Sequence, residues 1–175
     1  MYLSKEFFDR DVLEVAPDMV GKILIRKLND GKYLRYRITE TEAYRGTDDK
    51  ACHANKGRTP RTEVMYGDPG TIYVYLIYGM YWMLNFVTEK KDVPQAVLIR
   101  GVEGFNGPGK LTKALDIDKT FNRESIINNN RLIIFDDRYV PEIITAPRVG
   151  IDYAGEVWAS KPWRFIDKSL SDFKP

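Results

Sequence analysis

The residues best suited to chemistry in this chain lie in the run Arg37-Ile-Thr-Glu-Thr-Glu-Ala-Tyr44. Alternate side chains of a strand point to opposite faces, so this run, read as a strand, places Glu40, Glu42 and Tyr44 together. A carboxylate beside an aromatic ring on rigid backbone is suited to activating water next to a stacked, flat ligand. The alternative is a half-solvated strand whose acidic side chains only face water.

A second candidate region is the aromatic run Tyr73-Val-Tyr-Leu-Ile-Tyr-Gly-Met-Tyr-Trp82. Tyr78 precedes Gly79 at the expected apex of a hairpin, where an aromatic ring is hard to bury in the protein's own core. An inserted ring can fill the gap left by an extruded nucleotide, and base–aromatic stacking contributes roughly 1–3 kcal/mol. Core packing is the competing interpretation, and we favour it for Trp82. Together the two regions indicate a protein that holds a nucleobase and does chemistry beside it.

Two further polar residues could serve such a site. Arg100 ends an apolar run that begins at Ala96, and an arginine beside a carboxylate keeps it ionised and oriented. His53 is the only histidine, and it follows the only cysteine, Cys52. This pair is not the ligand set that zinc requires, and no P-loop, nucleophile elbow or dinucleotide motif is present. The sequence predicts no metal and no cofactor; for Arg100 and His53 an ordinary surface role remains the alternative.

Length and composition indicate a single domain. The chain has 175 residues, and domains typically have about 100–200. A single cysteine cannot form a disulfide within the chain, which fits a reducing compartment. The N-terminal residues lack the apolar run of a signal peptide or membrane span. We therefore expect a cytoplasmic protein with no membrane association, folded as one domain over residues 1–175.

The net charge of +2 is too small to attract nucleic acid by itself, but basic residues gather locally. The relevant residues are Arg35, Arg37, Arg45, Lys50, Lys56, Arg58, Arg61, Arg148, Lys161 and Arg164. They either neutralise phosphates or form a solvated face with the interleaved acidic residues, and charge alone favours the second interpretation.

The hydrophobic pattern predicts an α+β fold: one compact domain with a mainly antiparallel sheet, a protruding hairpin and several short helices. Expected strands cover residues 23–28, 33–44, 71–78, 81–88, 96–103, 131–135, 143–146 and 163–166. Expected helices cover residues 4–8, with Ser4 as the N-cap, 12–19 and 110–115. Residues 45–70 are expected to form a long polar loop, and residues 118–130 a weakly ordered connection.

The chain also resembles a known family, the alkyladenine (3-methyladenine) DNA glycosylases of the human type. The resemblance rests on the motifs Glu40-Thr-Glu-Ala-Tyr44, His53, Pro69-Gly-Thr-Ile-Tyr-Val-Tyr75, Tyr78-Gly-Met-Tyr81, Asn85, Val97-Leu-Ile-Arg100 and Pro147-Arg-Val-Gly150. It covers essentially the whole chain apart from a weak stretch near residues 118–145.

The resemblance implies a monofunctional enzyme of base-excision repair. Such an enzyme flips an alkylated or deaminated purine (3-methyladenine, 7-methylguanine, hypoxanthine or ethenoadenine) out of double-stranded DNA. It then hydrolyses the N-glycosidic bond and leaves an abasic site. By this resemblance Glu42 is the general base that deprotonates the attacking water, and Arg100 helps to hold that water. We expect a monomer.

The remaining site residues follow from the same resemblance. Tyr44, His53 and Tyr75 are expected to enclose the flipped base. Asn85 is expected to crowd the 2-amino group of guanine, and Tyr78 to intercalate from the minor groove. Two other functions stay open: a non-catalytic nucleic-acid-binding module with an aromatic platform, and a small-molecule hydrolase acting on nucleosides.

Overall fold

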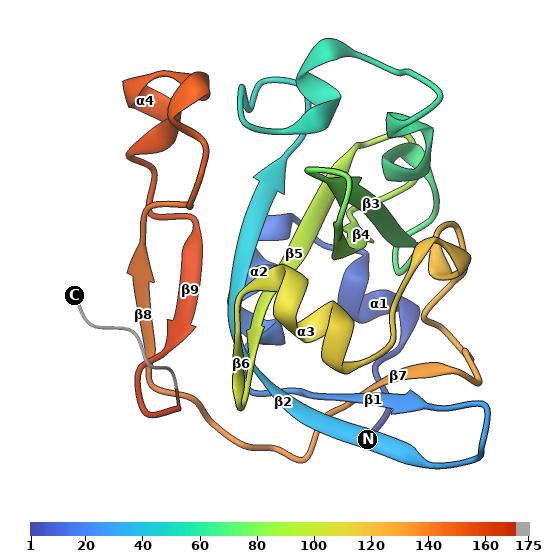
Figure 1. The fold of residues 1–175 in the computed structure, drawn as a ribbon. Helices are drawn as coiled ribbons and strands as arrows, with labels where there is room; N and C mark the ends of the chain where they lie inside the picture. Colours follow the sequence, from blue (N-terminus) through green and yellow to red (C-terminus); the bar gives the residue numbers. More distant parts are fainter. Residues whose placement is uncertain (171–175) are drawn as a thin grey trace.

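The computed structural model describes residues 1–170, which contain one mixed sheet-and-helix body (Figure 1). The strands are β1 (Ile23–Lys27), β2 (Tyr33–Arg45), β3 (Ile72–Ile77), β4 (Tyr81–Thr88), β5 (Gln95–Val102), β6 (Phe105–Asn106), β7 (Leu132–Phe135), β8 (Ile143–Ala146) and β9 (Arg164–Asp167). The α-helices are α1 (Lys5–Phe8), α2 (Val12–Met19), α3 (Pro108–Ala114) and α4 (Glu156–Ala159). The predicted α+β class is confirmed. That residues 1–175 form one glycosylase domain stays a prediction, and residues 171–175 of it lie outside the described part.

The strands pair antiparallel in the order β3-β4-β5-β2-β1-β7, with β6 beside β5 and β9 bridging β2 and β8. The long strand β2 belongs to two parts of this sheet. Its first residues pair with β1, and its later residues pair with β5 on one side and β9 on the other. Figure 1 shows β2 running along the body, with the antiparallel pair β8–β9 beside it. The segment around Glu40 and Glu42 is therefore held between two strands.

Two compensating bulges interrupt the pairing of β2 with β5. Ile38 pairs with Val102 and Glu40 with Gly101, so Thr39 is an extra residue on β2. Thr41 then pairs with Ile99, so Arg100 is the extra residue on β5. A bulge redirects the side chains around it and is often found beside functional sites.

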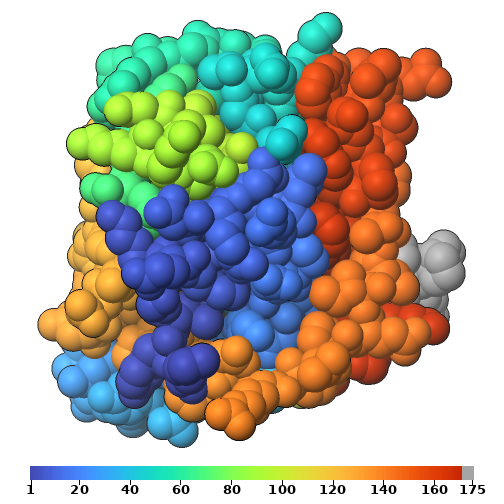
Figure 2. All heavy atoms as spheres, turned by 180° about the vertical axis from the view of Figure 1, so that it is seen from behind, coloured from blue at the N-terminus to red at the C-terminus, as the bar shows by residue number. Residues whose placement is uncertain are grey.

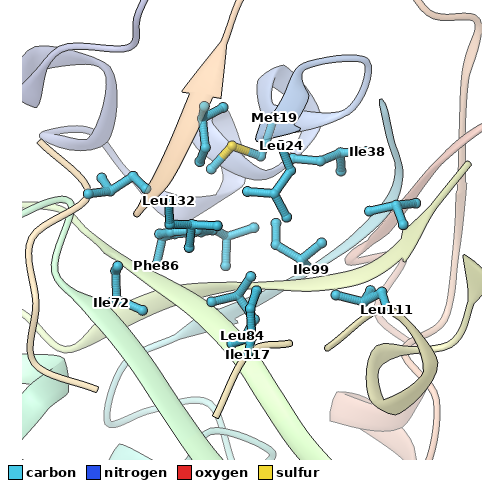
Figure 3. Close-up of a cluster of buried hydrophobic side chains, with 14 of the residues drawn as sticks. Met19, Leu24, Ile38, Ile72, Leu84, Phe86, Ile99, Leu111, Ile117 and Leu132 are labelled. Atoms are coloured by element: carbon cyan, nitrogen blue, oxygen red, sulfur yellow. The ribbon is translucent and has the colours of Figure 1, made fainter. Parts of the chain in front are cut away.

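Apolar side chains from the strands and from the helices packed on them fill the interior (Figure 3). Helix α2 has the predicted bounds and buries Val15 and Met19. Asp11 is its N-cap, and the Asp11 side chain accepts a hydrogen bond from Leu13 N (2.9 Å). It packs on β2 and β5, whereas α3 packs on β4 and β5 through Leu111. Each such fully buried side chain stabilises the fold by roughly 1.5–3 kcal/mol.

On the face opposite to that of Figure 1, the N-terminal residues lie beside the segment near residue 90 (Figure 2). Glu89 N donates hydrogen bonds to Phe8 O (2.9 Å) and Arg10 O (3.0 Å), which fastens this contact. None of the helices within residues 1–170 has the length and apolar character needed to cross a membrane.

Three local expectations were wrong. Residues 45–70 are not an open polar loop, because they contain the 3₁₀ helices η1 (His53–Lys56) and η2 (Thr62–Tyr66) and many of their side chains are buried. Residues 118–130 are also better ordered than expected, since η3 (Lys119–Phe121) buries the Phe121 ring in the core. Ser4 occupies the N-cap of α1, but its side chain makes no capping hydrogen bond. Helix α4 and η4 (Asp152–Ala154) had no counterpart in the prediction.

Candidate active site

A cavity of about 450 Å³ opens on one face of strands β2, β5, β4 and β3. One row of directly paired residues crosses these strands: Glu42, Leu98, Asn85 and Tyr73. Paired residues of neighbouring antiparallel strands project to the same face, so the register alone gathers these side chains. The cavity lining includes every residue that the sequence predicted for the site: Glu42, Tyr44, His53, Tyr75, Tyr78, Asn85 and Arg100. Their individual roles stay predictions.

Glu42 lies in the wall of this cavity and is held at both carboxylate oxygens. Only 1% of its surface is exposed. Val149 N donates a hydrogen bond to Oε1 (2.8 Å), and the Tyr44 hydroxyl donates one to Oε2 (2.8 Å). Burial raises the pKa of the Glu42 carboxyl, while Arg100 and the two hydrogen bonds partly offset that rise. A positioned carboxylate with a raised pKa has the properties of a general base.

Arg100 is surrounded by carboxylates on the sheet face. Its Nε lies 3.0 Å from Glu40 Oε1 and 3.6 Å from Glu42 Oε1. This buried Nε makes no well-directed hydrogen bond to any described residue. Glu40 Oε1 also accepts a hydrogen bond from Arg164 Nη1 on β9 (3.1 Å). A side chain at Gly101 would crowd this arrangement, since a Cβ there would lie 3.3 Å from Glu40 Cβ.

Three rings form the opposite wall, and all are uncharged near neutral pH. A hydrogen bond of 3.0 Å joins His53 Nδ1 to the Tyr73 hydroxyl, and the His53 ring meets Tyr75 edge-on with centroids 4.6 Å apart. Burial, with a smaller contribution from nearby Arg61, lowers the pKa of His53 to about 4. Burial raises the pKa of both Tyr73 and Tyr75, so the phenols stay protonated. Neutral rings can stack on a cationic ligand without repelling it.

Asn85 and Tyr78 occupy contrasting positions along the cavity. Asn85 is buried, and its Nδ2 donates to Tyr73 O (3.2 Å) and Met83 O (3.3 Å), which fixes the amide on the cavity face. Tyr78 is 86% exposed at the tip of the β3–β4 hairpin, with a left-handed φ of +51°. Met80, in the same turn, is also exposed.

Several lining residues were not predicted as site residues. Tyr73, for which the sequence predicted no site role, lines the cavity. The segment Val149–Ile151 also closes the cavity, and Tyr153 does so while donating a hydrogen bond to Ala51 O (3.1 Å). The motif Pro147-Arg-Val-Gly150 marked this segment as part of the resemblance but gave no sign that it touches the strand with Glu42.

Most of the basic residues named from the sequence fall into two groups. Acidic side chains hold many of them, in the pairs Arg37–Asp137, Arg45–Asp11, Arg58–Glu63, Arg148–Asp49 and Arg164–Glu40. The side chain of Arg148 is fully buried, so neither interpretation raised from the sequence, phosphate contact or a solvated face, applies to it. Lys50, Lys56 and Arg61 instead line a hollow of about 340 Å³ that shares His53 and Tyr153 with the main cavity.

Cys52, which precedes His53 in the sequence, is buried and contributes to the cavity lining. Burial raises the pKa of its thiol to about 11, so the reactive thiolate is scarce near neutral pH. Within residues 1–170 no cluster of three or more His, Cys, Asp and Glu side chains could hold a metal ion.

Comparisons with known proteins agree on one family. The sequence model of the methylpurine-DNA glycosylase family matches residues 6–170. A provisionally named 3-methyladenine DNA glycosylase of Methanocella arvoryzae is 47% identical over 187 residues, covering 95% of this chain and 92% of that protein. One of Borrelia garinii is 46% identical and covers 95% of this chain and 96% of that protein. One of Desulfitobacterium hafniense is 42% identical and covers 93% of each. The resemblance stated from the motifs is confirmed: the chain belongs to the methylpurine-DNA glycosylase family and is a DNA glycosylase, a hydrolase acting on N-glycosyl bonds.

Proposed function

We propose that this protein excises alkylated and deaminated purines, including 3-methyladenine, 7-methylguanine, hypoxanthine and ethenoadenine, from double-stranded DNA. The damaged nucleotide rotates out of the helix into the cavity, water replaces the base at C1′, and an abasic site remains. The protein acts as a monomer in the cytoplasm.

The observation that carries this proposal is the setting of Glu42, an oriented and buried carboxylate beside Arg100 in a cavity with uncharged aromatic walls. In the proposed reaction Glu42 accepts a proton from the attacking water as the C1′–N bond breaks. The sugar develops oxocarbenium character, and the nearby negative charge stabilises that transition state. Arg100 holds the water and keeps the carboxylate ionised.

The proposed lesion range follows from the cavity walls. Alkylated purines such as 7-methylguanine carry a positive charge, which neutral rings of Tyr44, His53 and Tyr75 can stabilise by cation–π attraction. Hypoxanthine is neutral and needs protonation of the leaving base. Asn85 disfavours undamaged guanine by crowding its 2-amino group. 7-Methylguanine has the same group, but its positive charge makes it a much better leaving base, so it is still excised.

The proposed DNA contacts lie on both sides of the cavity. Tyr78 enters the space that the flipped nucleotide leaves, and Met80 lies beside it. Lys50, Lys56 and Arg61 contact phosphates near the lesion, so affinity falls as salt concentration rises.

The first test is single-turnover cleavage of a duplex oligonucleotide with one hypoxanthine, developed with alkali to reveal abasic sites. A parallel duplex carries 7-methylguanine. The wild-type protein is compared with Glu42→Gln. Glu142→Gln is the matched control, because it makes the same change at an exposed carboxylate that pairs with Lys168 and does not line the cavity.

We expect excision by the wild type and by Glu142→Gln, and a loss of about 10²–10⁴-fold for Glu42→Gln with lesion binding retained. Excision of 7-methylguanine alone would restrict the proposal to cationic purines. Lesion binding without excision of either base would favour a non-catalytic nucleic-acid-binding module. Full activity of Glu42→Gln would remove Glu42 as the base.

A further inference from the structure

The most deeply buried ion pair in the described part of the chain joins two segments that form the cavity wall. Arg148 Nη1 lies 2.6 Å from Asp49 Oδ2 and Nη2 lies 2.9 Å from Oδ1, and both side chains are 0% exposed. Desolvation of two charges largely cancels their attraction, so a buried pair is weak evidence for added stability. Added stability therefore does not explain this ion pair, and its neighbours indicate what it positions.

Asp49 organises the chain between β2 and the aromatic wall. Its Oδ2 accepts a hydrogen bond from Arg45 N at the end of β2 (3.0 Å). Its Oδ1 accepts one from Ala51 N (3.0 Å), two residues before His53. One carboxylate thus connects the end of the strand that carries Glu42 with the start of the segment that carries His53.

Arg148 contacts β2, the strand that carries Glu42, next to Glu42 itself. Its Nη1 donates a hydrogen bond to Ala43 O (2.9 Å), between Glu42 and Tyr44. Arg148 Cζ lies 4.9 Å from the centroid of the Tyr44 ring and 5.0 Å from that of Trp163. The guanidinium therefore packs against the ring whose hydroxyl binds Glu42. The residue that follows Arg148 is Val149, whose N–H binds the other Glu42 oxygen.

Both hydrogen bonds to the Glu42 carboxylate therefore depend on Arg148. The Val149 N–H comes from the adjacent peptide unit, and the Tyr44 hydroxyl belongs to a ring that the guanidinium supports. We propose that the Arg148–Asp49 pair is a positioning pair, which anchors segment 147–151 against β2 so that Glu42 is held in its reactive orientation. This inference rests on the proposed role of Glu42 as the general base.

The proposal predicts a specific effect on the ionisation of Glu42. Both hydrogen bonds stabilise the anionic carboxylate, so their loss should raise its pKa further. The other titratable or charged groups that influence Glu42 are Arg100, Glu40, Tyr44, Tyr75 and Tyr153. All of them remain when the pair is replaced, and removing one cation and one anion leaves the net charge unchanged.

The test is the double variant Arg148→Met with Asp49→Leu, which fills the space with uncharged side chains. The matched control is Arg37→Met with Asp137→Leu. Arg37 also makes a bidentate pair (2.9 and 2.7 Å), donates to a carbonyl, Gly21 O (2.6 Å), and lies over a ring, Tyr139 (4.4 Å), but none of these residues lines the cavity.

We expect the Arg148/Asp49 double variant to stay folded and to bind a 7-methylguanine duplex with nearly unchanged affinity. Its single-turnover rate constant should fall by about 10²-fold, because even a small misplacement of a reacting group slows a reaction by this order. The acid limb of the pH–rate profile should move to higher pH. The Arg37/Asp137 control should show the wild-type rate constant and the wild-type position of the acid limb.

A direct readout does not depend on catalysis. A ¹³C NMR titration of the Glu42 δ-carboxyl, assigned by its absence in Glu42→Gln, should give a higher pKa in the double variant than in the wild type. A wild-type protein that fails to excise would contradict the proposed function, and this titration would still test the positioning role.

If the double variant does not fold, Arg148→Lys replaces it, because lysine keeps the charge but loses the planar fork and the stacking surface. We expect the same loss of the excision rate constant and the same rise in the pKa of Glu42. An unchanged Glu42 pKa in a folded variant, or a reduced rate with an unmoved acid limb, would overturn the proposal.

Discussion

The cavity and the tip of the β3–β4 hairpin depart from ordinary folding rules in opposite ways. The cavity wall buries charge: Glu42 and Glu40 are almost fully buried, and the partly buried Arg100 lies beside both. The tip does the reverse, because it exposes the apolar surfaces of Tyr78 and Met80 to water. Both arrangements are unfavourable in the free protein, since proteins normally bury apolar groups and leave charges in water.

This difference indicates that the cavity is built for chemistry and the hairpin tip for contact with DNA. In the cavity the groups are already connected by hydrogen bonds, so little has to move before chemistry begins. At the tip almost nothing holds the exposed side chains, which fits a surface that acquires partners only when DNA is bound. Changes in the cavity should therefore lower rate constants, and changes at the tip should lower affinity.

The largest effect is expected for Glu42→Gln. This change should lower the excision rate constant but raise the free energy of unfolding at neutral pH. The folded-state pKa of Glu42 is raised above its unfolded-state value, so the fold favours the protonated form. Stability from this group is full at low pH and is lost as pH rises through the unfolded and then the folded value. Glutamine, which is always neutral, should therefore unfold at a higher urea concentration than wild type at neutral pH.

Urea titrations at neutral and acidic pH measure this difference, which should shrink as the wild-type carboxyl becomes protonated. Glu142→Gln, at the exposed carboxylate, should show no such gain. A glutamine variant that is less stable than wild type at neutral pH would mean that the ionised carboxylate supports the fold.

The next effect concerns Arg100, whose charge is the largest influence that lowers the pKa of Glu42. Arg100→Met should move the acid limb of the pH–rate profile to higher pH and slow excision at neutral pH by about 10–10²-fold. A 7-methylguanine duplex is the suitable substrate, because its leaving base needs no protonation. An acid limb at the wild-type position would show that Arg100 does not govern the ionisation of Glu42.

These two residues show what could be predicted from the sequence. The alternation of Glu40, Glu42 and Tyr44 correctly indicated that Glu42 lies near the other two, since the period of a strand is a local property. Tyr44 donates a hydrogen bond to Glu42, and Glu40 and Glu42 share Arg100. The predicted bounds of α2 were also confirmed, because a regular apolar spacing is a local signal.

Other features depend on partners distant in the chain and leave no local signal. The bulge at Arg100 arises only from the pairing of β5 with β2. The contact of Val149 with Glu42 joins positions more than a hundred residues apart. Residues 45–70 looked polar and loop-like, yet Asp49 is buried through its pairing with Arg148, which composition does not reveal.

At the tip, Tyr78→Ala should reduce affinity for a lesion duplex by about tenfold, because stacking on one base contributes roughly 1–3 kcal/mol and each 1.4 kcal/mol is a factor of ten. The urea midpoint should stay near the wild-type value. Fluorescence anisotropy measures the affinity. Tyr33→Ala at the β1–β2 hairpin, which removes a half-exposed tyrosine outside the cavity, is the control. Equal lesion affinity for wild type and Tyr78→Ala would assign Tyr78 to the solvated surface.

The smallest effect separates the ring of Tyr78 from its backbone. A φ of +51° is in the left-handed region, which costs most L-residues roughly 1–2 kcal/mol but which asparagine adopts more readily. Tyr78→Asn should therefore lose as much lesion affinity as Tyr78→Ala, yet unfold at a slightly higher urea concentration than the alanine variant. A stability equal to that of Tyr78→Ala would mean that the turn relaxes without strain. A higher stability would mean that the exposed ring is kept at a backbone position that favours another residue, as expected where binding rather than folding determines the side chain.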